Sequence, residues 1–301
     1  MKKIAISVGD LNGVGIEIAL KSHKEVKKLC NPIYCINKKM LIQSAKLLNV
    51  KIPKDFKTHK VNGIFKIKAG VINKESGLYS YNSFISAIKL CESKSADAVV
   101  TMPIHKEAWM LAGLEYKGHT DLLRKYFNKE AIMMLGCNKM FVALFSEHVP
   151  LKDVAKSIKY KKLKQFFLSL NKSIPNEKIA VLGLNPHAGD NGVLGNEETI
   201  IKKAIKSANK KIGFEQFAGI LVPDIAFTPH IRKKYKYFVA MYHDQGLAPL
   251  KALYFDESIN VSLNLPIIRT SVDHGTAFDI AYKGEAKTLS YINAIKSALS
   301  F

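Results

Sequence analysis

The chain has 301 residues, enough for a sizeable core and two lobes, and its 48% hydrophobic and 24% charged residues are typical of a soluble globular protein. No apolar run approaches the roughly 18 residues of a membrane-spanning segment, so we expect no membrane partner. The amino terminus is predicted to be a first strand and not an export signal. Four cysteines without metal-type or disulfide-type spacing indicate reduced thiols and a cytoplasmic location.

The net charge of +21 raises the question of a nucleic-acid partner. Only three of the 46 basic residues are arginines, and the lysines are spread along amphipathic segments such as KKLKQFF at 161–167. That distribution is typical of solvated helix faces, and the sequence contains no aromatic RNA-binding platform, zinc-finger spacing or basic zipper. We therefore expect no specific nucleic-acid partner, and a positive field that attracts phosphorylated small substrates.

Short apolar strands alternate with helical patterns from the amino terminus onward. A strand at 3–8 runs into the glycine turn GDLNGVGIE, and a helical pattern continues to Leu29. The backbone N–H groups of such a turn can bind a phosphate or carboxylate, although the glycine spacing is not GxGxxG. The alternative is that the glycines only allow a tight turn. Further strands are expected in NPIYCIN and ADAVVTMP, with helices at about 38–50 and 79–93.

The middle of the chain interrupts this alternation. Residues 131–146 contain two apolar runs around GCNK, which is the pattern of a β-hairpin. A long helix from Lys152, the strand KIAVLGL, a helix at 196–211, the strand FAGILV and a closing helix follow. The pattern predicts an α/β fold with a mostly parallel sheet covered by helices on both faces, and the hairpin places a lobe boundary near residue 125.

The stretch from Met241 to Ala277 concentrates polar side chains between the predicted strands YFVAM and INVSL. In an open α/β sheet, ligands bind at the carboxyl ends of the strands. HDQG and DHGT could each be a surface turn, but the lysine, asparagine and arginine between them favour a site for an anionic ligand. The residues concerned are His243, Asp244, Lys251, Asn260, Arg269, Asp273 and His274.

The motif GHT in GLEYKGHTDLL precedes another helical pattern. Thr120 is a suitable N-cap for that helix, and His119 is expected just outside it. A histidine at such a position is usually a surface residue, so this motif by itself does not indicate a site.

Three histidines each follow a predicted strand: His148, His187 and His243. Three neutral imidazoles with an open fourth position are what a catalytic Zn²⁺ or a similar divalent ion requires. Their separations match no local metal motif, so surface or structural histidines remain the alternative. Asp244 is available to orient one of the imidazoles.

Six segments occur in a characteristic order: GDLNGVGIE, PIHK, GHT, GLNPHAGDNGVLGNEE, AMYHDQGLAPLK and NLPIIRTSVDHGTAFDIA. In order and spacing they resemble the 4-hydroxythreonine-4-phosphate dehydrogenase family of pyridoxine biosynthesis. The resemblance covers essentially the whole chain. Its most specific parts are NPHAGD and the blocks from MYHDQG to SVDHGTA.

The resemblance implies a fold similar to isocitrate and isopropylmalate dehydrogenases, with two α/β/α lobes, mostly parallel sheets and an active site in the interlobe cleft. Residues 1–125 and 270–301 would form the first, cofactor-binding lobe, and residues 126–269 the second lobe with the metal and the dimer interface. The implied cofactor is NAD, with NADP as an alternative. The implied metal is Zn²⁺, with Mg²⁺ or Co²⁺ as alternatives.

The same resemblance assigns roles to individual residues. It implies metal ligation by His148, His187 and His243, with one ligand from the second subunit of a homodimer whose active site lies at the subunit interface. The segment DHGTAFDIA resembles the cofactor loop HGSAPDIAGKG of isocitrate and isopropylmalate dehydrogenases. The resemblance therefore implies NAD contacts from His274, Gly275 and Asp279. Substrate contacts are implied for His119, Thr120, Lys251, Asn260 and Arg269.

The implied reaction is oxidation of 4-phosphohydroxy-L-threonine by NAD⁺, followed by loss of CO₂ to give 3-amino-2-oxopropyl phosphate, in pyridoxal 5'-phosphate biosynthesis. A divalent ion would lower the pKa of the substrate hydroxyl and polarise the new carbonyl, while Lys251 or Asp244 would relay protons. One alternative is a related dehydrogenase of 4-phospho-D-threonate or 4-phospho-D-erythronate. Another is a phosphate acyltransferase on a similar sheet, which would need no metal.

The chain also departs from the family pattern. Leu11 and Ile16 stand where prolines are usual, Glu147 stands where a threonine is common, and Tyr282 replaces the glycine of the AGxG segment. No proposed metal ligand is lost.

Overall fold

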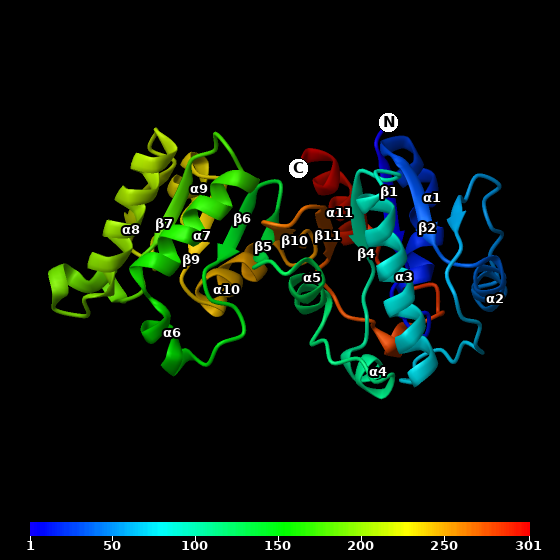
Figure 1. Cartoon of the computed structure of the whole chain (residues 1–301). Helices are drawn as coiled ribbons and strands as arrows, with labels where there is room; N and C mark the ends of the chain where they lie inside the picture. Colours follow the sequence, from blue (N-terminus) through cyan, green and yellow to red (C-terminus); the bar gives the residue numbers. More distant parts are fainter. The chain divides into compact units, whose positions relative to one another are not determined.

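Strands and helices alternate along the whole chain in a computed structural model, which describes residues 1–301 (Figure 1). Most strand neighbours are parallel, including β1 with β2 and β4, and β9 with β6 and β7. The hairpin predicted around GCNK is present, with β5 and β6 antiparallel. The α/β class and the mostly parallel pairing are therefore confirmed. No helix is both long enough and apolar enough to cross a membrane.

The chain divides into two compact units. The first unit contains Met1–Lys129, Ile259–Val261 and Leu265–Phe301, and the second contains Glu130–Ser258 and Ser262–Asn264. Arg269, which lies inside the predicted second lobe, is in the first unit.

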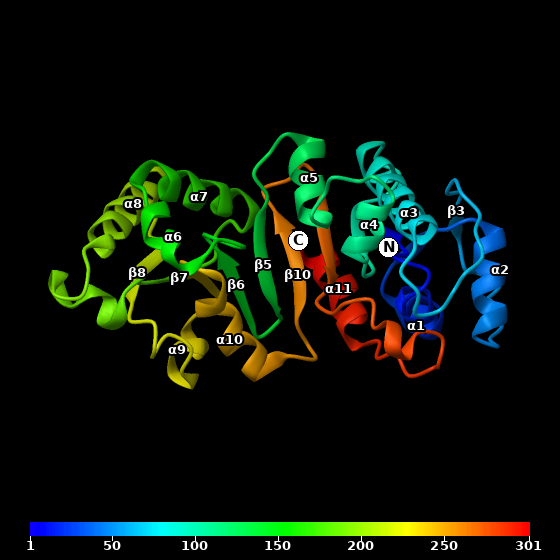
Figure 2. The ribbon, with the colours of Figure 1, turned by 90° about the horizontal axis from the view of Figure 1, so that it is seen from below.

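The first unit has the strand order β3-β2-β1-β4-β11-β10. Helix α3 covers one face of these strands, and α1 and α11 cover the other face (Figure 2). Apart from the two-residue β3, its strands are short runs of mostly buried residues, as expected for parallel strands covered on both sides. The elements are β1 (Lys3–Ser7), α1 (Gly15–Leu29), β2 (Asn31–Cys35), α2 (Lys38–Leu47), β3 (Thr58–His59), α3 (Lys74–Glu92), β4 (Ala98–Thr101), α4 (Lys106–Leu111), α5 (His119–Phe127), β10 (Ile259–Leu263, of which Ile259–Val261 belong to this unit), β11 (Ile268–Val272), the 3₁₀ turn Phe278–Ile280 and α11 (Leu289–Ser300).

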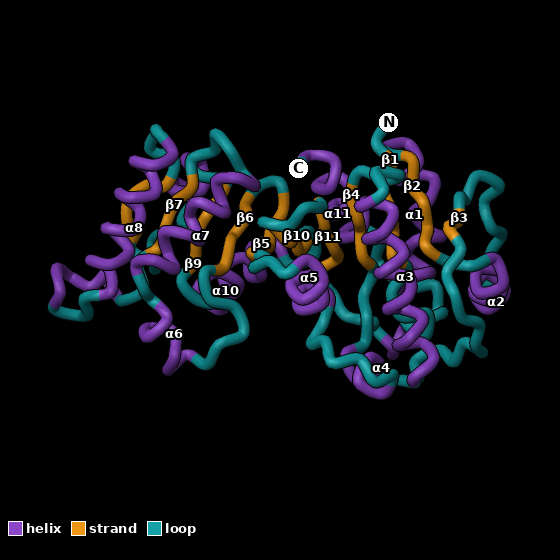
Figure 3. Tube along the Cα trace, viewed as in Figure 1, coloured by secondary structure: helices purple, strands orange, loops and turns teal.

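The second unit has the strand order β5-β6-β9-β7-β8. Helices α7 and α8 pack together on one face, and α10 packs against β5, β6 and β9 on the other (Figures 2 and 3). The single helix expected from Lys152 is instead two helices, because the chain turns at the buried Ile158. The elements are β5 (Ile132–Cys137), β6 (Met140–Leu144), α6 (Leu151–Ser157), α7 (Tyr160–Ser173), β7 (Ile179–Leu182), the 3₁₀ segment Pro186–Gly192, α8 (Glu197–Ile212), β8 (Phe217–Leu221), α9 (Pro229–Lys234), β9 (Tyr237–Ala240) and α10 (His243–Tyr254).

Helix ends follow from local sequence. Asn73 caps α3 by accepting a hydrogen bond from the Ser76 N–H, as a short polar side chain at this position typically does. Helix α8 starts with two glutamates and ends with two lysines before Gly213, whose φ of 95° is the left-handed conformation that glycine adopts at little cost. These signals explain where α3 begins and where α8 ends.

Candidate functional site

His148 and His243 lie next to each other in the second unit. Their ring centroids are 5.6 Å apart, with an interplanar angle of 41°. His148 follows β6 and His243 follows β9, and these two strands are parallel neighbours. The Met241 carbonyl accepts hydrogen bonds from the Ser146 N–H at 3.2 Å and from its hydroxyl at 2.7 Å, which ties the two strand ends together. Strand pairing thus brings together two histidines that are far apart in the sequence.

Asp244 orients the imidazole of His243. The His243 Nδ1 and Asp244 Oδ1 atoms are 2.7 Å apart, and with Nδ1 as the donor the Nε2 atom presents its lone pair. A carboxylate on the second ring nitrogen is the usual arrangement behind a metal-bound histidine. Lys251 lies two turns further along the same helix, half-buried, with Nζ 5.5 Å from the centre of the Phe255 ring.

The HDQG segment opens helix α10 and does not form an isolated turn. Gly246 allows the helix to lie close to the sheet, because a Cβ there would be 2.5 Å from Val142 Cγ1. Gln245 accepts the Met241 N–H and donates to the Gly183 carbonyl, both at 2.7 Å. The first turn of α10, and with it His243, is therefore held against the ends of β9 and β7.

His187 follows β7 in an uncommon backbone conformation. All five residues from His187 to Asn191 have positive φ, between 41° and 80°, which costs free energy for residues other than glycine. Glu198 holds the start of this turn by accepting the N–H groups of Leu184 and Asn185, both at 2.8 Å. Burial tends to raise the pKa of Glu198, but these hydrogen bonds outweigh it and the pKa is lowered.

The donor set fits a divalent ion in part. The two neighbouring rings of His148 and His243 could bind one ion, and neutral imidazoles suit Zn²⁺ and similar metals. The structure gathers no set of three His, Cys, Asp or Glu side chains suited to a metal, so His187 is not grouped with the other two within this chain.

His119 and Arg269 interact electrostatically in the first unit, where Arg269 is buried and His119 is partly exposed with a buried Nε2 atom. The His119 ring lies edge-on to Phe84 and Trp109, with centroid distances of 4.7 and 5.8 Å. Arg269 is 2% exposed and donates from a terminal guanidinium nitrogen to Thr101 Oγ1 at 2.7 Å. Burial, and then the charge of Arg269, hold the pKa of His119 well below 6.5, while burial lowers the pKa of Arg269 to about 9. The pair is thus a neutral imidazole beside a guanidinium cation at neutral pH.

The other predicted substrate residues occupy different environments. Asn260 lies on β10, and its Oδ1 atom is buried without a hydrogen-bond partner within the chain. The prediction that Thr120 caps α5 is wrong, because the helix starts at His119 and the N-cap is Gly118. Gly118 has a φ of 147°, which a glycine adopts readily and a threonine does not. Thr120 is therefore a first-turn residue of α5.

The low pKa of His119 predicts a specific pH dependence of stability. An unfolded histidine takes up a proton below about pH 6.5, whereas His119 in the folded protein does not, because its pKa is lower, so folding is disfavoured as the pH falls below that value. His119→Phe, which keeps the aromatic packing, should remove this contribution of up to about 1.4 kcal/mol per pH unit. Urea unfolding from pH 7 to pH 5 measures it, with the exposed His230→Asn as the control. Parallel curves for wild type and His119→Phe would contradict the assignment.

The segment from Asp273 onward packs on the glycine turn between β1 and α1. The Val14 N–H donates to the Thr276 carbonyl at 3.0 Å. His274, Gly275 and Asp279 are all exposed, and a Cβ at Gly275 would meet no atom within 4 Å. The three residues predicted to contact NAD are therefore accessible, with room for a ligand beside the backbone of Gly275.

Asp10 and His105 form a second polar group near this segment, and no role follows for them from the sequence. Asp10 is buried and accepts the Asn12 N–H at 2.9 Å and the Ser76 hydroxyl at 3.0 Å, and burial raises its pKa. The His105 ring stacks on Phe278 at 5.0 Å, and its Nδ1 atom is buried without a hydrogen-bond partner. The signal that could have identified both is their position just after a buried strand, β1 or β4.

Comparison with known proteins identifies the family of the chain. The model of the family described as pyridoxal phosphate biosynthetic protein PdxA matches residues 28–298. A Sulfurimonas denitrificans protein named 4-hydroxythreonine-4-phosphate dehydrogenase is 78% identical over 298 residues, which are 99% of this chain and 97% of that protein. A Campylobacter fetus protein of the same name is 58% identical over 300 residues, 99% of this chain and 98% of that protein.

Solved structures extend the agreement to the fold. A crystal structure of a 4-hydroxythreonine-4-phosphate dehydrogenase from Burkholderia phymatum matches with a TM-score of 0.85 at 30% identity, over 99% of this chain and 97% of that chain. The resemblance inferred from the six sequence segments is thereby confirmed. With residues 28–298 matched by the family model and relatives aligned over nearly the full length, the chain belongs to the PdxA family of pyridoxal phosphate biosynthetic proteins.

Proposed function

We propose that this protein oxidises 4-phosphohydroxy-L-threonine with NAD⁺ and decarboxylates the product to 3-amino-2-oxopropyl phosphate, a step in pyridoxal 5'-phosphate biosynthesis. The observation that carries the proposal is the pairing of His148 with His243, supported by Asp244, in a chain closely similar to relatives named for this substrate. Hydride leaves the secondary alcohol for NAD⁺ and a proton is released. The resulting β-keto acid then loses CO₂ and gains a proton at carbon.

The first unit supplies substrate contacts. The buried guanidinium of Arg269 binds an anionic end of the substrate through charge-assisted hydrogen bonds, which are strong where water is excluded. His119 is neutral beside it, so its ring can offer a hydrogen bond without adding a second charge. Thr120 and the buried amide oxygen of Asn260 complete these contacts.

The second unit supplies the metal ligands and the proton relay. His148 and His243 hold a divalent ion, proposed as Zn²⁺ with Mg²⁺ or Co²⁺ as alternatives, together with His187, and one ligand of each set comes from the partner subunit. When bound, the ion supplies Lewis-acid polarisation of the substrate hydroxyl and of the carbonyl that replaces it. Asp244 is engaged with His243 Nδ1, which supports Lys251 as the residue that donates the proton after CO₂ is lost.

The proposal includes NAD and a second subunit. NAD, with NADP as an alternative, binds at His274, Gly275 and Asp279, and the accessibility of all three residues supports this placement. The protein works as a cytoplasmic homodimer in which residues 126–269 contain the metal ligands and form the dimer interface. The exposed side chains of Leu253 and Phe255, at 43% and 66%, support an apolar contact at the end of α10.

The test is NADH formation by purified protein that has been stripped with a chelator. We expect no turnover of 4-phosphohydroxy-L-threonine until Zn²⁺, Mg²⁺ or Co²⁺ is added back. Turnover indifferent to metal would contradict the roles of His148, His187 and His243. Activity only with 4-phospho-D-threonate or 4-phospho-D-erythronate would keep the metal chemistry and replace the proposed substrate.

A further inference from the structure

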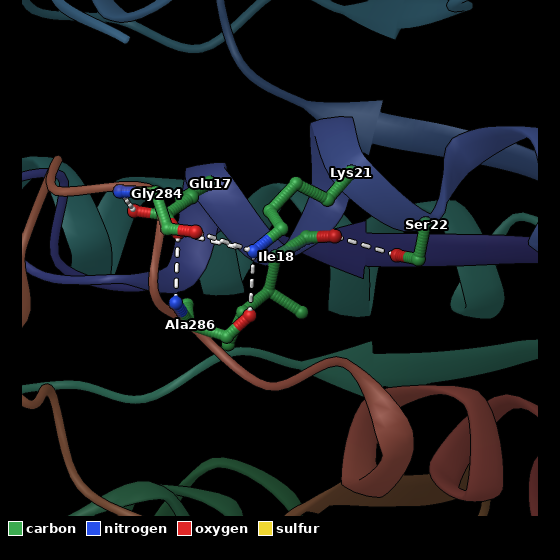
Figure 4. Close-up of polar contacts among 6 residues, drawn as sticks. All are labelled: Glu17, Ile18, Lys21, Ser22, Gly284 and Ala286. Carbon is green, nitrogen blue, oxygen red and sulfur yellow. Dashed lines mark hydrogen bonds and ion pairs between the residues drawn. The ribbon is translucent and has the colours of Figure 1, made fainter.

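Two side chains of helix α1 hold the end of the segment 273–286 (Figure 4). Glu17 is 1% exposed, and its carboxylate accepts the Ala286 N–H at 2.9 Å and the Gly284 N–H at 3.3 Å. Lys21, one turn along the helix, donates to the carbonyls of Gly284 and Ala286 at 2.8 and 2.9 Å. Glu17 Oε1 and Lys21 Nζ are 3.6 Å apart, so the two charges also face each other. The Glu17 carboxylate thus accepts hydrogen bonds from two backbone N–H groups of residues 284–286, and the Lys21 ammonium donates to two backbone carbonyls of the same residues.

Tyr282 fixes the same segment from inside. Its φ of 63° lies in the left-handed region, which is uncommon for a bulky residue and explains why a glycine suits this position. The Tyr282 hydroxyl donates to the Leu11 carbonyl at 2.7 Å and lies 3.3 Å from Ser44 Oγ. Such a backbone conformation persists only where the surroundings hold it, and here hydrogen bonds from the side chain do so.

The beginning of the segment is anchored as well. The Thr276 carbonyl accepts the Val14 N–H at 3.0 Å, and a Cβ on Gly13 would lie 2.7 Å from that carbonyl oxygen. The segment 273–286 is therefore attached at both ends to residues 11–21. Between the anchors, His274, Gly275 and Asp279 stay exposed.

We propose that Glu17, Lys21 and Tyr282 are positioning residues that hold the segment 273–286 in the conformation that binds the dinucleotide. This inference rests on the proposed use of NAD at that segment. Ordering a loop during binding weakens affinity, so a loop ordered beforehand by hydrogen bonds to a rigid helix binds more tightly. None of the three side chains needs to touch the dinucleotide or the reacting atoms for this effect.

The test uses Glu17→Gln and Tyr282→Phe, each of which removes hydrogen bonds without creating a large cavity. Glu25→Gln, on the exposed face of the same helix, and Tyr160→Phe, which loses a hydroxyl contact to Ser207 in the second unit, are the matched controls. Amide hydrogen exchange of residues 282–287 is measured in protein without dinucleotide. The Kd for NADH is measured by fluorescence, and KM and kcat by turnover.

In both variants we expect the amide hydrogens of Gly284 and Ala286 to exchange with solvent faster than in the wild type. We also expect both variants to bind NADH roughly tenfold more weakly. KM for NAD⁺ should rise in step, while kcat at saturating NAD⁺ stays within about twofold, because the reacting groups are untouched. The control variants should leave exchange of the segment and the Kd unchanged.

Faster exchange with an unchanged Kd for NADH would overturn the inference, because it would mean that the contacts serve only the fold. Equal exchange in variants and wild type would overturn it too. A wild-type protein with no affinity for NADH would overturn the proposed cofactor, and the inference with it. Normal NADH binding by the wild type and by both variants would leave the proposed function intact and reject the positioning role.

Discussion

His243→Ala is expected to lower kcat/KM for 4-phosphohydroxy-L-threonine by at least about a thousandfold, the scale on which removal of one member of a catalytic unit acts. The variant loses one of two neighbouring imidazoles, and Asp244 loses the ring that it orients. The His243 side chain is 38% exposed, so its removal leaves no closed cavity and should change the free energy of unfolding by less than about 1 kcal/mol. Metal affinity, measured by competition with a chromogenic chelator, should fall together with activity.

His230→Ala provides the control for this result. His230 is exposed on α9 in the same unit, so its replacement should leave both metal affinity and turnover unchanged. If His243→Ala were to retain near-normal turnover at saturating Zn²⁺, the metal role of the pair would be wrong. A loss of activity with unchanged metal affinity would mean that His243 contacts the substrate and not the metal.

Arg269→Met is expected to raise KM for the phosphorylated substrate by at least about thirtyfold, because loss of one partner from a buried charged contact costs about 2–5 kcal/mol. The ligand-free fold should be affected much less. Arg269 is 2% exposed, and burial lowers its pKa to about 9, so the fold bears a cost for holding this cation. Methionine fills much of the same volume without a charge, so the free energy of unfolding should change by less than about 1 kcal/mol.

Arg232→Met should show the opposite behaviour. Arg232 donates to the Phe227 carbonyl at 2.9 Å and to the Tyr254 hydroxyl at 2.6 Å, so its loss should destabilise the second unit. KM should not change, because Arg232 has no proposed substrate contact. Steady-state kinetics and urea unfolding of the two variants therefore separate substrate binding from stability. Equal KM values for Arg269→Met and wild type would exclude Arg269 from the substrate site.

The departures at Leu11 and Tyr282 could not be interpreted from the sequence. In the structure the Tyr282 hydroxyl contacts the Leu11 carbonyl, so two unusual positions about 270 residues apart belong to one contact. The backbone of Tyr282 is left-handed, as a glycine would be, and the side chain compensates by hydrogen bonding. A sequence comparison identifies the substitution but cannot supply the contact that makes it acceptable.

Several local signals were sufficient by themselves. The apolar strands, the hairpin around GCNK and the helices with asparagine or glycine at their ends depend on neighbouring residues in the chain, and the structure contains them. The six family segments identified the PdxA family before any geometry was known, and the comparisons confirm it. The sequence also showed that His148, His187 and His243 each follow a strand, which is a property of residue order.

The tertiary structure decided what residue order cannot express. The β6–β9 pairing joins strands nearly 100 residues apart and brings His148 to His243, because strand order depends on packing of the whole sheet. The N-cap of α5 is Gly118, with a φ of 147° that suits glycine, and not Thr120 as the sequence suggested. The lowered pKa values of His119 and Arg269, each caused mainly by desolvation of the group itself, arise from long-range packing among β11, β4 and α5. Sequence therefore determined the elements, the family and the chemical types of the site residues, whereas long-range packing determined which of them meet.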